Sequence, residues 1–181
     1  MRSSRFGGIV AALAVVEVAA CGASPSPTPS LAPDADAGAV VTAKPPQQPF
    51  HFDHRIHAGK YQIPCQTCHV YADHSTIAGI PTASKCMGCH RFVDGNKPDV
   101  KALAKAFEER TPIVWNRVHR LPDHVFFNHE RHVLHGVPCS RCHGAVETMA
   151  VVRQVSPLTM GWCVDCHREN QAPTDCWTCH K

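Results

Sequence analysis

The stretch CQTCH, Cys65 to His69, places two cysteines three residues apart and a histidine directly after the second. The same C-x-x-C-H pattern returns as CMGCH (Cys86–His90), CSRCH (Cys139–His143), CVDCH (Cys163–His167) and CWTCH (Cys176–His180). These five motifs use all but one of the 11 cysteines. Because His follows every pair, the pattern indicates covalent attachment of c-type haem. We number the motifs sites 1 to 5 in chain order.

The spacing inside each motif suits one porphyrin. Residues i and i+3 share a face of a helical turn, so both thiols can form thioethers to one haem. The next residue lies beneath the ring, where its imidazole can bind iron. We therefore expect five covalently bound haem c groups. The expected attachment residues are Cys65, Cys68, Cys86, Cys89, Cys139, Cys142, Cys163, Cys166, Cys176 and Cys179, and the expected proximal ligands are His69, His90, His143, His167 and His180.

Two other uses of C-x-x-C pairs compete with haem attachment. Structural zinc sites combine two such pairs, and small secreted proteins use cysteines in a disulfide framework. An odd number of pairs and the constant histidine argue against zinc.

The first residues, MRSSRFGGIVAALAVVEVAAC, have arginines, then an apolar run, then small residues before Cys21. This is the plan of a secretory signal, and VAAC resembles the lipobox of bacterial lipoproteins. We expect residues 1–20 to be a lipoprotein signal peptide and Cys21 to be lipidated. Glu17 inside the apolar run leaves open an ordinary signal or an uncleaved anchor. The expected location is the periplasmic side of a bacterial membrane, inner or outer, reached through the lipid anchor.

The rest of the chain changes composition near residue 50. Residues 21–49 are rich in Pro, Ala and Ser and predict a flexible tether. Residues 50–181 are expected to form a pentahaem domain with a two-haem module at 50–95, a connector helix at 97–124 and a three-haem module at 125–181. Within the connector, KPDVKALAKAFEER (Lys97–Arg110) has helical periodicity and is expected to pack on a haem or module rather than bind a partner.

The expected fold class is mostly irregular, with short α-helices and the haems forming the core, because so few residues serve five haems. We expect no nucleic-acid partner, since the sequence has no run of Lys or Arg.

Two short segments ahead of the motifs share a second pattern. FDHRIH (Phe52–His57) precedes site 1 and FNHERH (Phe127–His132) precedes site 3, and both read F-x-H-x-x-H. Each leads through a Pro-Cys step into two consecutive haem motifs. The chain therefore appears as a duplicated two-haem module, with site 5 added at the end.

The F-x-H-x-x-H segments ahead of C-x-x-C-H resemble small multihaem cytochromes of the c3 and c7 type. The resemblance implies that the second His of each pair faces the nearest haem, so His57 would face His69 and His132 would face His143. The first members would serve neighbours: His54 the iron of His90, and His129 the iron of His167. The histidines outside the motifs outnumber the second ligands needed: His51, His54, His57, His74, His119, His124, His129, His132 and His135.

Three longer segments carry a closer resemblance: residues 112–144 (PIVWNRVHRLPDHVFFNHERHVLHGVPCSRCHG), 157–168 (PLTMGWCVDCHR) and 78–90 (AGIPTASKCMGCH). They are similar to the pentahaem cytochrome c subunit of alternative complex III, a bacterial quinol oxidoreductase. The resemblance implies partners in a quinol-oxidising membrane complex, and a cytochrome c or oxidase as acceptor. It also implies His119 as the fifth distal ligand. Independently of the resemblance, Met160 is a rival for one distal position, since a Met/His pair would raise that haem's potential, while packing beside a porphyrin is the alternative role. The lipobox-like leader departs from the membrane helix expected of that subunit.

Two other functions remain open. A free-standing c3-type periplasmic shuttle would need no fixed complex. A multihaem reductase of a small oxyanion would need one iron with an open position, yet all five motifs end in His and distal candidates are in surplus. We therefore expect an electron-transfer subunit without catalytic residues of its own.

Overall fold

The computed structural model describes residues 44–181, which belong to the unit Asp36–Lys181. The expected signal peptide, the lipidated Cys21 and most of the tether lie outside the described residues. No helix within 44–181 combines the length and hydrophobicity needed to cross a membrane.

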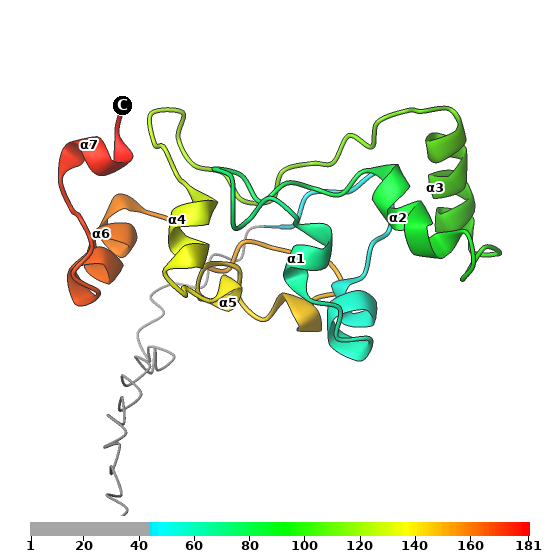
Figure 1. Cartoon of the computed structure of the whole chain (residues 1–181), viewed down its shortest axis with the longest axis horizontal. Coiled ribbons are helices and arrows are strands. Elements are labelled where there is room, and N and C mark those ends of the chain that lie inside the picture. Colours follow the sequence, from blue (N-terminus) through cyan, green and yellow to red (C-terminus); the bar gives the residue numbers. More distant parts are fainter. Residues whose placement is uncertain (1–43) are drawn as a thin grey trace, which may run out of the picture. The chain divides into compact units, whose positions relative to one another are not determined.

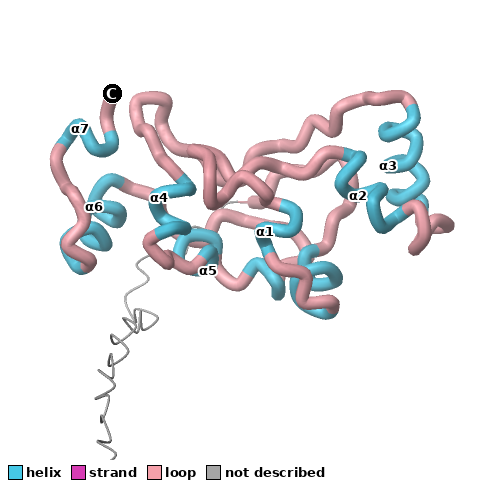
Figure 2. The backbone as a smooth tube through the Cα atoms, viewed as in Figure 1, coloured by secondary structure: helices cyan, strands magenta, loops and turns pink. Residues whose placement is uncertain are grey.

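Short helices joined by long loops make up the described chain (Figures 1 and 2). Within residues 44–181 an isolated antiparallel bridge joins Val125 to His180, and no sheet forms. The expectation of a mostly irregular fold with short helices is confirmed. In chain order the elements are π-helix η1 (Arg55–Lys60), α1 (Cys65–Cys68), α2 (Ala83–His90), α3 (Pro98–Glu108), α4 (His129–Leu134), α5 (Cys139–His143), the 3-10 helix η2 (Val146–Thr148), α6 (Met160–Glu169) and α7 (Cys176–Cys179).

The helix of the connector is shorter than the connector itself. Pro98 stands in the first turn of α3, where its missing N–H costs no hydrogen bond, and Asp99 lies near the positive end of the helix dipole. Val100 is buried, and α3 packs against α2. The helix ends at Glu108, and residues 111–124 are not helical.

The two F-x-H-x-x-H segments begin their helices in related ways. The Asp53 carboxylate accepts a hydrogen bond from the Arg55 N–H (2.9 Å) at the start of η1. The Asn128 side-chain oxygen accepts one from the Arg131 N–H (3.1 Å) at the start of α4. Asp and Asn satisfy free N–H groups at helix starts, so the residue after each Phe sets where the histidine-bearing helix begins.

The two modules contact each other through loops that follow their first haem motifs. The carbonyl oxygens of Ser75 and Thr76, after site 1, accept hydrogen bonds from the backbone at the start of α4 (3.0 and 3.3 Å). Reciprocally, η2 follows site 3 and packs against η1. A Cβ on Gly59 would lie 2.6 Å from the Glu147 carbonyl oxygen, so η1 and η2 can approach this closely only with glycine there. We call the loop that holds Ser75 and Thr76, together with the segment η2, the exchanged loops.

Few apolar side chains are buried in the described chain. The buried hydrophobic residues are Ala72, Ala83, Met87, Val100 and Met149, and no described side chain is less than 2% exposed. A protein of this length ordinarily needs a larger apolar core to offset the entropy of ordering its backbone. The polypeptide alone therefore lacks the interior that would hold its loops in place.

Candidate functional site

All five C-x-x-C-H motifs lie on helices. Sites 1, 3 and 5 begin α1, α5 and α7, and sites 2 and 4 lie in α2 and α6. Prolines 64 and 138 stand immediately before α1 and α5 with extended backbone, so each helix starts at its first cysteine. The ten motif cysteines are free thiols, one helical turn apart within each pair. They are thus placed for two bonds to one ligand, and the disulfide alternative finds no support in residues 44–181.

The motif histidines face a second set of histidine rings. His90 lies opposite His57, with ring centroids 5.9 Å apart, and His167 lies opposite His132 at 6.1 Å. At site 3 the rings of His143 and His129 are almost parallel (7°) and 6.3 Å apart. At site 5 the rings of His180 and His124 are 5.5 Å apart at 21°.

These separations suit an iron held between two imidazoles. Two metal–nitrogen bonds of about 2 Å, added to the distance from each nitrogen to its ring centre, give roughly 6 Å between centroids. Within residues 44–181, no three His, Cys, Asp or Glu side chains converge as they would around zinc. At sites 2 to 5 the residues present therefore fit haem iron with two axial histidines.

At site 1 the neighbouring histidine is His54. Burial lowers the pKa of His54 to about 4, and the nearby His69 of site 1 lowers it further. Burial likewise lowers the pKa of His143 to about 4. Both rings are neutral at pH 7, and neutral imidazole is the form that binds a metal.

Hydrogen bonds at Nδ1 determine which ring nitrogen remains for iron. Among the motif histidines, His69 donates to the Gly79 carbonyl (2.7 Å) and His167 to the Pro173 carbonyl (2.6 Å). Among the facing histidines, His57 and His132 each donate to the carbonyl four residues earlier, at 3.2 and 2.8 Å. A proton fixed on Nδ1 leaves the Nε2 lone pair free as the ligand atom.

The glycine at position 79 supports this contact at site 1. Its φ of +76° is favourable only for glycine, and a Cβ there would lie 2.6 Å from the Tyr71 ring. The carbonyl that orients His69 therefore depends on the absence of a side chain.

The two modules repeat the same ring geometry. Phe52 lies 4.7 Å edge-on from His54 and 4.5 Å stacked on His57. Phe127 lies 4.7 Å edge-on from His129 and 4.5 Å stacked on His132. In both segments the Phe of F-x-H-x-x-H thus holds the two histidine rings in different directions. The repetition of this geometry agrees with the duplication expected from the sequence.

The pairing differs from the one implied by the c3/c7 resemblance. In both modules the second His of the pair faces the second haem motif, and in the second module the first His faces the first motif. His57 therefore lies at site 2 and His132 at site 4, rather than at sites 1 and 3. The rings diverge because one is edge-on to the shared Phe and the other is stacked on it. The roles of these four histidines as distal ligands stay predictions.

His119 does not stand opposite a motif histidine at iron-binding distance. Its ring centroid is 4.4 Å from that of His143, too close for an iron between them, and the rings are perpendicular (84°). Its Nε2 lies 3.4 Å from Nδ1 of His143. Burial lowers the pKa of His119, with a further lowering from the nearby His129. The ring opposite His180 belongs instead to His124.

The position of His124 comes from a contact between distant parts of the chain. Phe126 N–H donates to the Cys179 carbonyl (2.8 Å), and His180 Nδ1 lies 3.1 Å from the His124 carbonyl. These contacts hold the residues before α4 against α7. No local pattern marks His124, since its partner is 56 residues away. Met160, the rival distal ligand, is 69% exposed at the start of α6.

The cysteines of different sites also lie near one another. Burial raises the pKa of Cys86, and the neighbouring Cys68 thiol of site 1 adds to the rise. Burial and then the Cys65 thiol of site 1 raise the pKa of Cys139 in site 3. In agreement with this, Figure 1 shows α1 of site 1 between α2 of site 2 and α5 of site 3.

The cysteines of sites 3, 4 and 5 also affect one another. Burial raises the pKa of Cys142 to about 11, with a further contribution from Cys166 in site 4. Burial raises the pKa of Cys163 in site 4, followed by the effect of Cys179 in site 5. Figure 1 shows the motif helices in the order α2, α1, α5, then α6 and α7, so the five sites form a row in the order 2, 1, 3, 4, 5, with site 3 in the middle.

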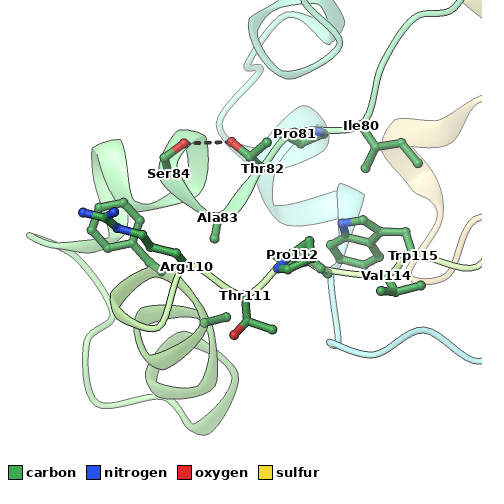
Figure 3. Close-up of a pocket in the computed structure, with 13 residues that line it drawn as sticks. Ile80, Pro81, Thr82, Ala83, Ser84, Arg110, Thr111, Pro112, Val114 and Trp115 are labelled. Atoms are coloured by element: carbon green, nitrogen blue, oxygen red, sulfur yellow. Dashed lines mark hydrogen bonds between the residues drawn. The ribbon is translucent and has the colours of Figure 1, made fainter.

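A cavity of about 670 Å³ adjoins the site 2 end of this row (Figure 3). The start of α2, the end of α3 and residues 110–115 line it. Trp115 lies at its edge, 6.3 Å from the Phe50 ring, and its indole N–H is buried without a hydrogen-bond partner. None of the cysteines or paired histidines lines this cavity, so it is separate from the ligating rings.

Comparison with known proteins matches both modules. The model of the class III cytochrome c family matches residues 32–118, and the model of cytochrome c7 and related cytochromes matches residues 125–181. The multihaem cytochrome c subunit of menaquinone reductase from Nitratidesulfovibrio vulgaris is 32% identical over 98 residues. That match covers 54% of this chain and 46% of the relative, so the chain spans about half the length of the curated relative.

The free cysteine pairs, the facing imidazoles and the two family matches agree on one kind of protein. The families imply covalently bound haem c and electron transfer. Residues 32–118 and 125–181 therefore carry c3/c7-like multihaem cytochrome c domains.

Proposed function

We propose that this chain is the electron-transfer subunit of a membrane complex, carrying electrons from a quinol-oxidising partner to a periplasmic cytochrome or terminal oxidase. The row of five sites carries the proposal. Sites 2 and 5 are its ends, so electrons would enter at one and leave at the other. When bound, haem supplies the one-electron chemistry. The chain's own residues hold neighbouring sites together and orient the imidazoles.

The role as a carrier rather than a catalyst rests on the ring pairs. Each motif histidine has a second imidazole close by, at all five sites. Reduction of a small oxyanion would need one iron with a free coordination position. Quinone chemistry and any other catalysis are therefore assigned to partner subunits.

The direction of electron flow has a second candidate. The relative from Nitratidesulfovibrio vulgaris is named as a subunit of a menaquinone reductase. The same row of sites could deliver electrons to a quinone-reducing partner, since direction depends on the potentials of the two ends and not on the order of the sites. A free-standing shuttle is disfavoured, because that relative works as a subunit.

Mild detergent extraction tests the proposal. On a native gel the haem-stained band should migrate with other subunits, and a menaquinol analogue should reduce the haems within that complex but not in the isolated cytochrome. If the reduced complex instead reduces menaquinone and the quinol does not reduce the haems, the second direction is correct. Migration of all haem at the size of the single chain would contradict both.

The purified protein is expected to carry five covalent haems, adding roughly 3 kDa to the mature polypeptide by thioether attachment. Intact-mass spectrometry measures this directly. The variant Cys176→Ser/Cys179→Ser should lose one haem, and a matched His74→Ala variant should keep all five. Four or fewer haems in fully matured wild-type protein would contradict the five-site assignment.

Lipidation at Cys21 is proposed as the membrane attachment. Two or more acyl chains give stable membrane binding where one is marginal, so Cys21→Ser should release the cytochrome from membranes that lack partner subunits. Haem content should not change, because Cys21 belongs to no haem motif. Fractionation followed by haem staining measures the release. A variant that stays as firmly bound as wild type would indicate an uncleaved anchor.

A further inference from the structure

The Nδ1 atoms of the five motif histidines have different environments. At sites 1, 4 and 5 the acceptor is a backbone carbonyl, of Gly79, Pro173 and His124 respectively. At site 2, Nδ1 of His90 is buried and has no hydrogen-bond partner in the described chain. At site 3 the neighbour of Nδ1 is a side chain, the imidazole of His119.

The geometry at site 3 assigns each nitrogen a role. The His143 ring is nearly parallel to that of His129 at iron-binding distance, and Nδ1 of His129 is already held by the Thr76 carbonyl at 3.1 Å. Nδ1 of His143 faces His119, so Nε2 is the nitrogen left for iron. Nδ1 then carries a proton and donates it, and Nε2 of His119 accepts, at a long distance of 3.4 Å.

We propose that His119 is a positioning residue for His143, which accepts its Nδ1–H, orients the imidazole and lowers the reduction potential at site 3. An acceptor at Nδ1 makes the ring a stronger electron donor, which favours the oxidised iron. The other three acceptors are backbone atoms, so site 3 is the site in the described chain where a side chain sets this contact.

The location of His119 gives the contact a role in the whole row. It lies in the non-helical part of the connector, after the end of α3 at Glu108, and its partner belongs to the middle site. Electrons that cross between the modules must pass site 3. If the reduction potential of site 3 were too high, electrons would remain on its haem. The contact from His119 lowers that potential. The connector thus tunes the junction as well as linking the modules.

The inference rests on His143 as an iron ligand but not on the identity of the electron partners, so the isolated holo-cytochrome is the material. His119→Ala removes the acceptor, and His119→Gln supplies a side-chain carbonyl in its place. His74→Ala is the matched control, since His74 is exposed and pairs with Asp73. Optical redox titration gives the potentials, EPR gives the spin states, and intact mass gives the haem count.

In His119→Ala, one of the five potentials should shift upward while the other four stay within the scatter of the control, and all haems should remain low-spin. His119→Gln should return that potential towards wild type. A new high-spin haem that binds carbon monoxide would make His119 an axial ligand and overturn the proposal. Five unchanged potentials, or an equal shift in the Gln variant, would overturn it as well.

A measurement on the wild type covers the case in which the Ala variant fails to mature. In the reduced, diamagnetic protein the Nδ1 proton of His143 should show a nuclear Overhauser effect to a ring proton of His119. An assigned Nδ1 proton without that effect would contradict the contact, and with it the proposed role.

Discussion

A chain that cannot attach haem is expected to be unfolded. Replacing all ten motif cysteines with serine removes every covalent attachment, while the remaining buried hydrophobic side chains are two alanines, two methionines and one valine. So small an apolar interior cannot offset the backbone entropy of the long loops. Far-ultraviolet circular dichroism should show little helix, and proton NMR should show narrow amide dispersion.

The holo-protein and the His74→Ala variant are the controls, and both should unfold in a cooperative thermal transition. A haem-free chain that also shows a cooperative transition and dispersed amides would mean that the polypeptide builds its own core. It would then contradict the view that the haems form the interior.

Replacing His124 with alanine is expected to change one iron from low-spin to high-spin. His124 is the ring opposite His180, at 5.5 Å, and no other histidine in the described chain is paired with that site. Loss of the second imidazole should open one coordination position, so the ferrous protein should bind one carbon monoxide per molecule where wild type binds none. Optical difference spectra and EPR measure both changes.

The paired variant His119→Ala separates the two assignments of the fifth ligand. The sequence resemblance implies His119, and the ring geometry favours His124. If the His119 variant binds carbon monoxide and the His124 variant stays wholly low-spin, His119 is the fifth ligand, as the sequence resemblance implies. The assignment of His124 from the ring geometry would then be rejected. The haem count of both variants should stay at five, because neither residue attaches haem.

The attachment residues and proximal ligands can be predicted from the sequence because each set lies within one local motif. The spacing of C-x-x-C-H describes one helical turn, and the structure has a helix at every motif. The same motifs predict the short helices and the small apolar core, since haems bound at them would take up the interior. The starts of η1 and α4 could be anticipated from Asp53 and Asn128.

The pairing of histidines could not be read in this way because it depends on contacts between distant segments. His54 and His57 are three residues apart and suit either of two irons on spacing alone. The ring of Phe52 sets the direction of each imidazole, because the His54 ring meets it edge-on and the His57 ring stacks on its face. His124 and His119 are distinguished only by the bridge to α7 and the perpendicular contact with His143.

The exchanged loops have a consequence for how the two modules assemble. In each module the loop after the first motif contacts the histidine-bearing helix of the other, which is the reciprocity of a two-fold symmetric interface. Each module thus supplies one half of both contacts, so the contacts themselves do not require a covalent connector. Chains cut between residues 109 and 118 are accordingly expected to reassemble when co-expressed.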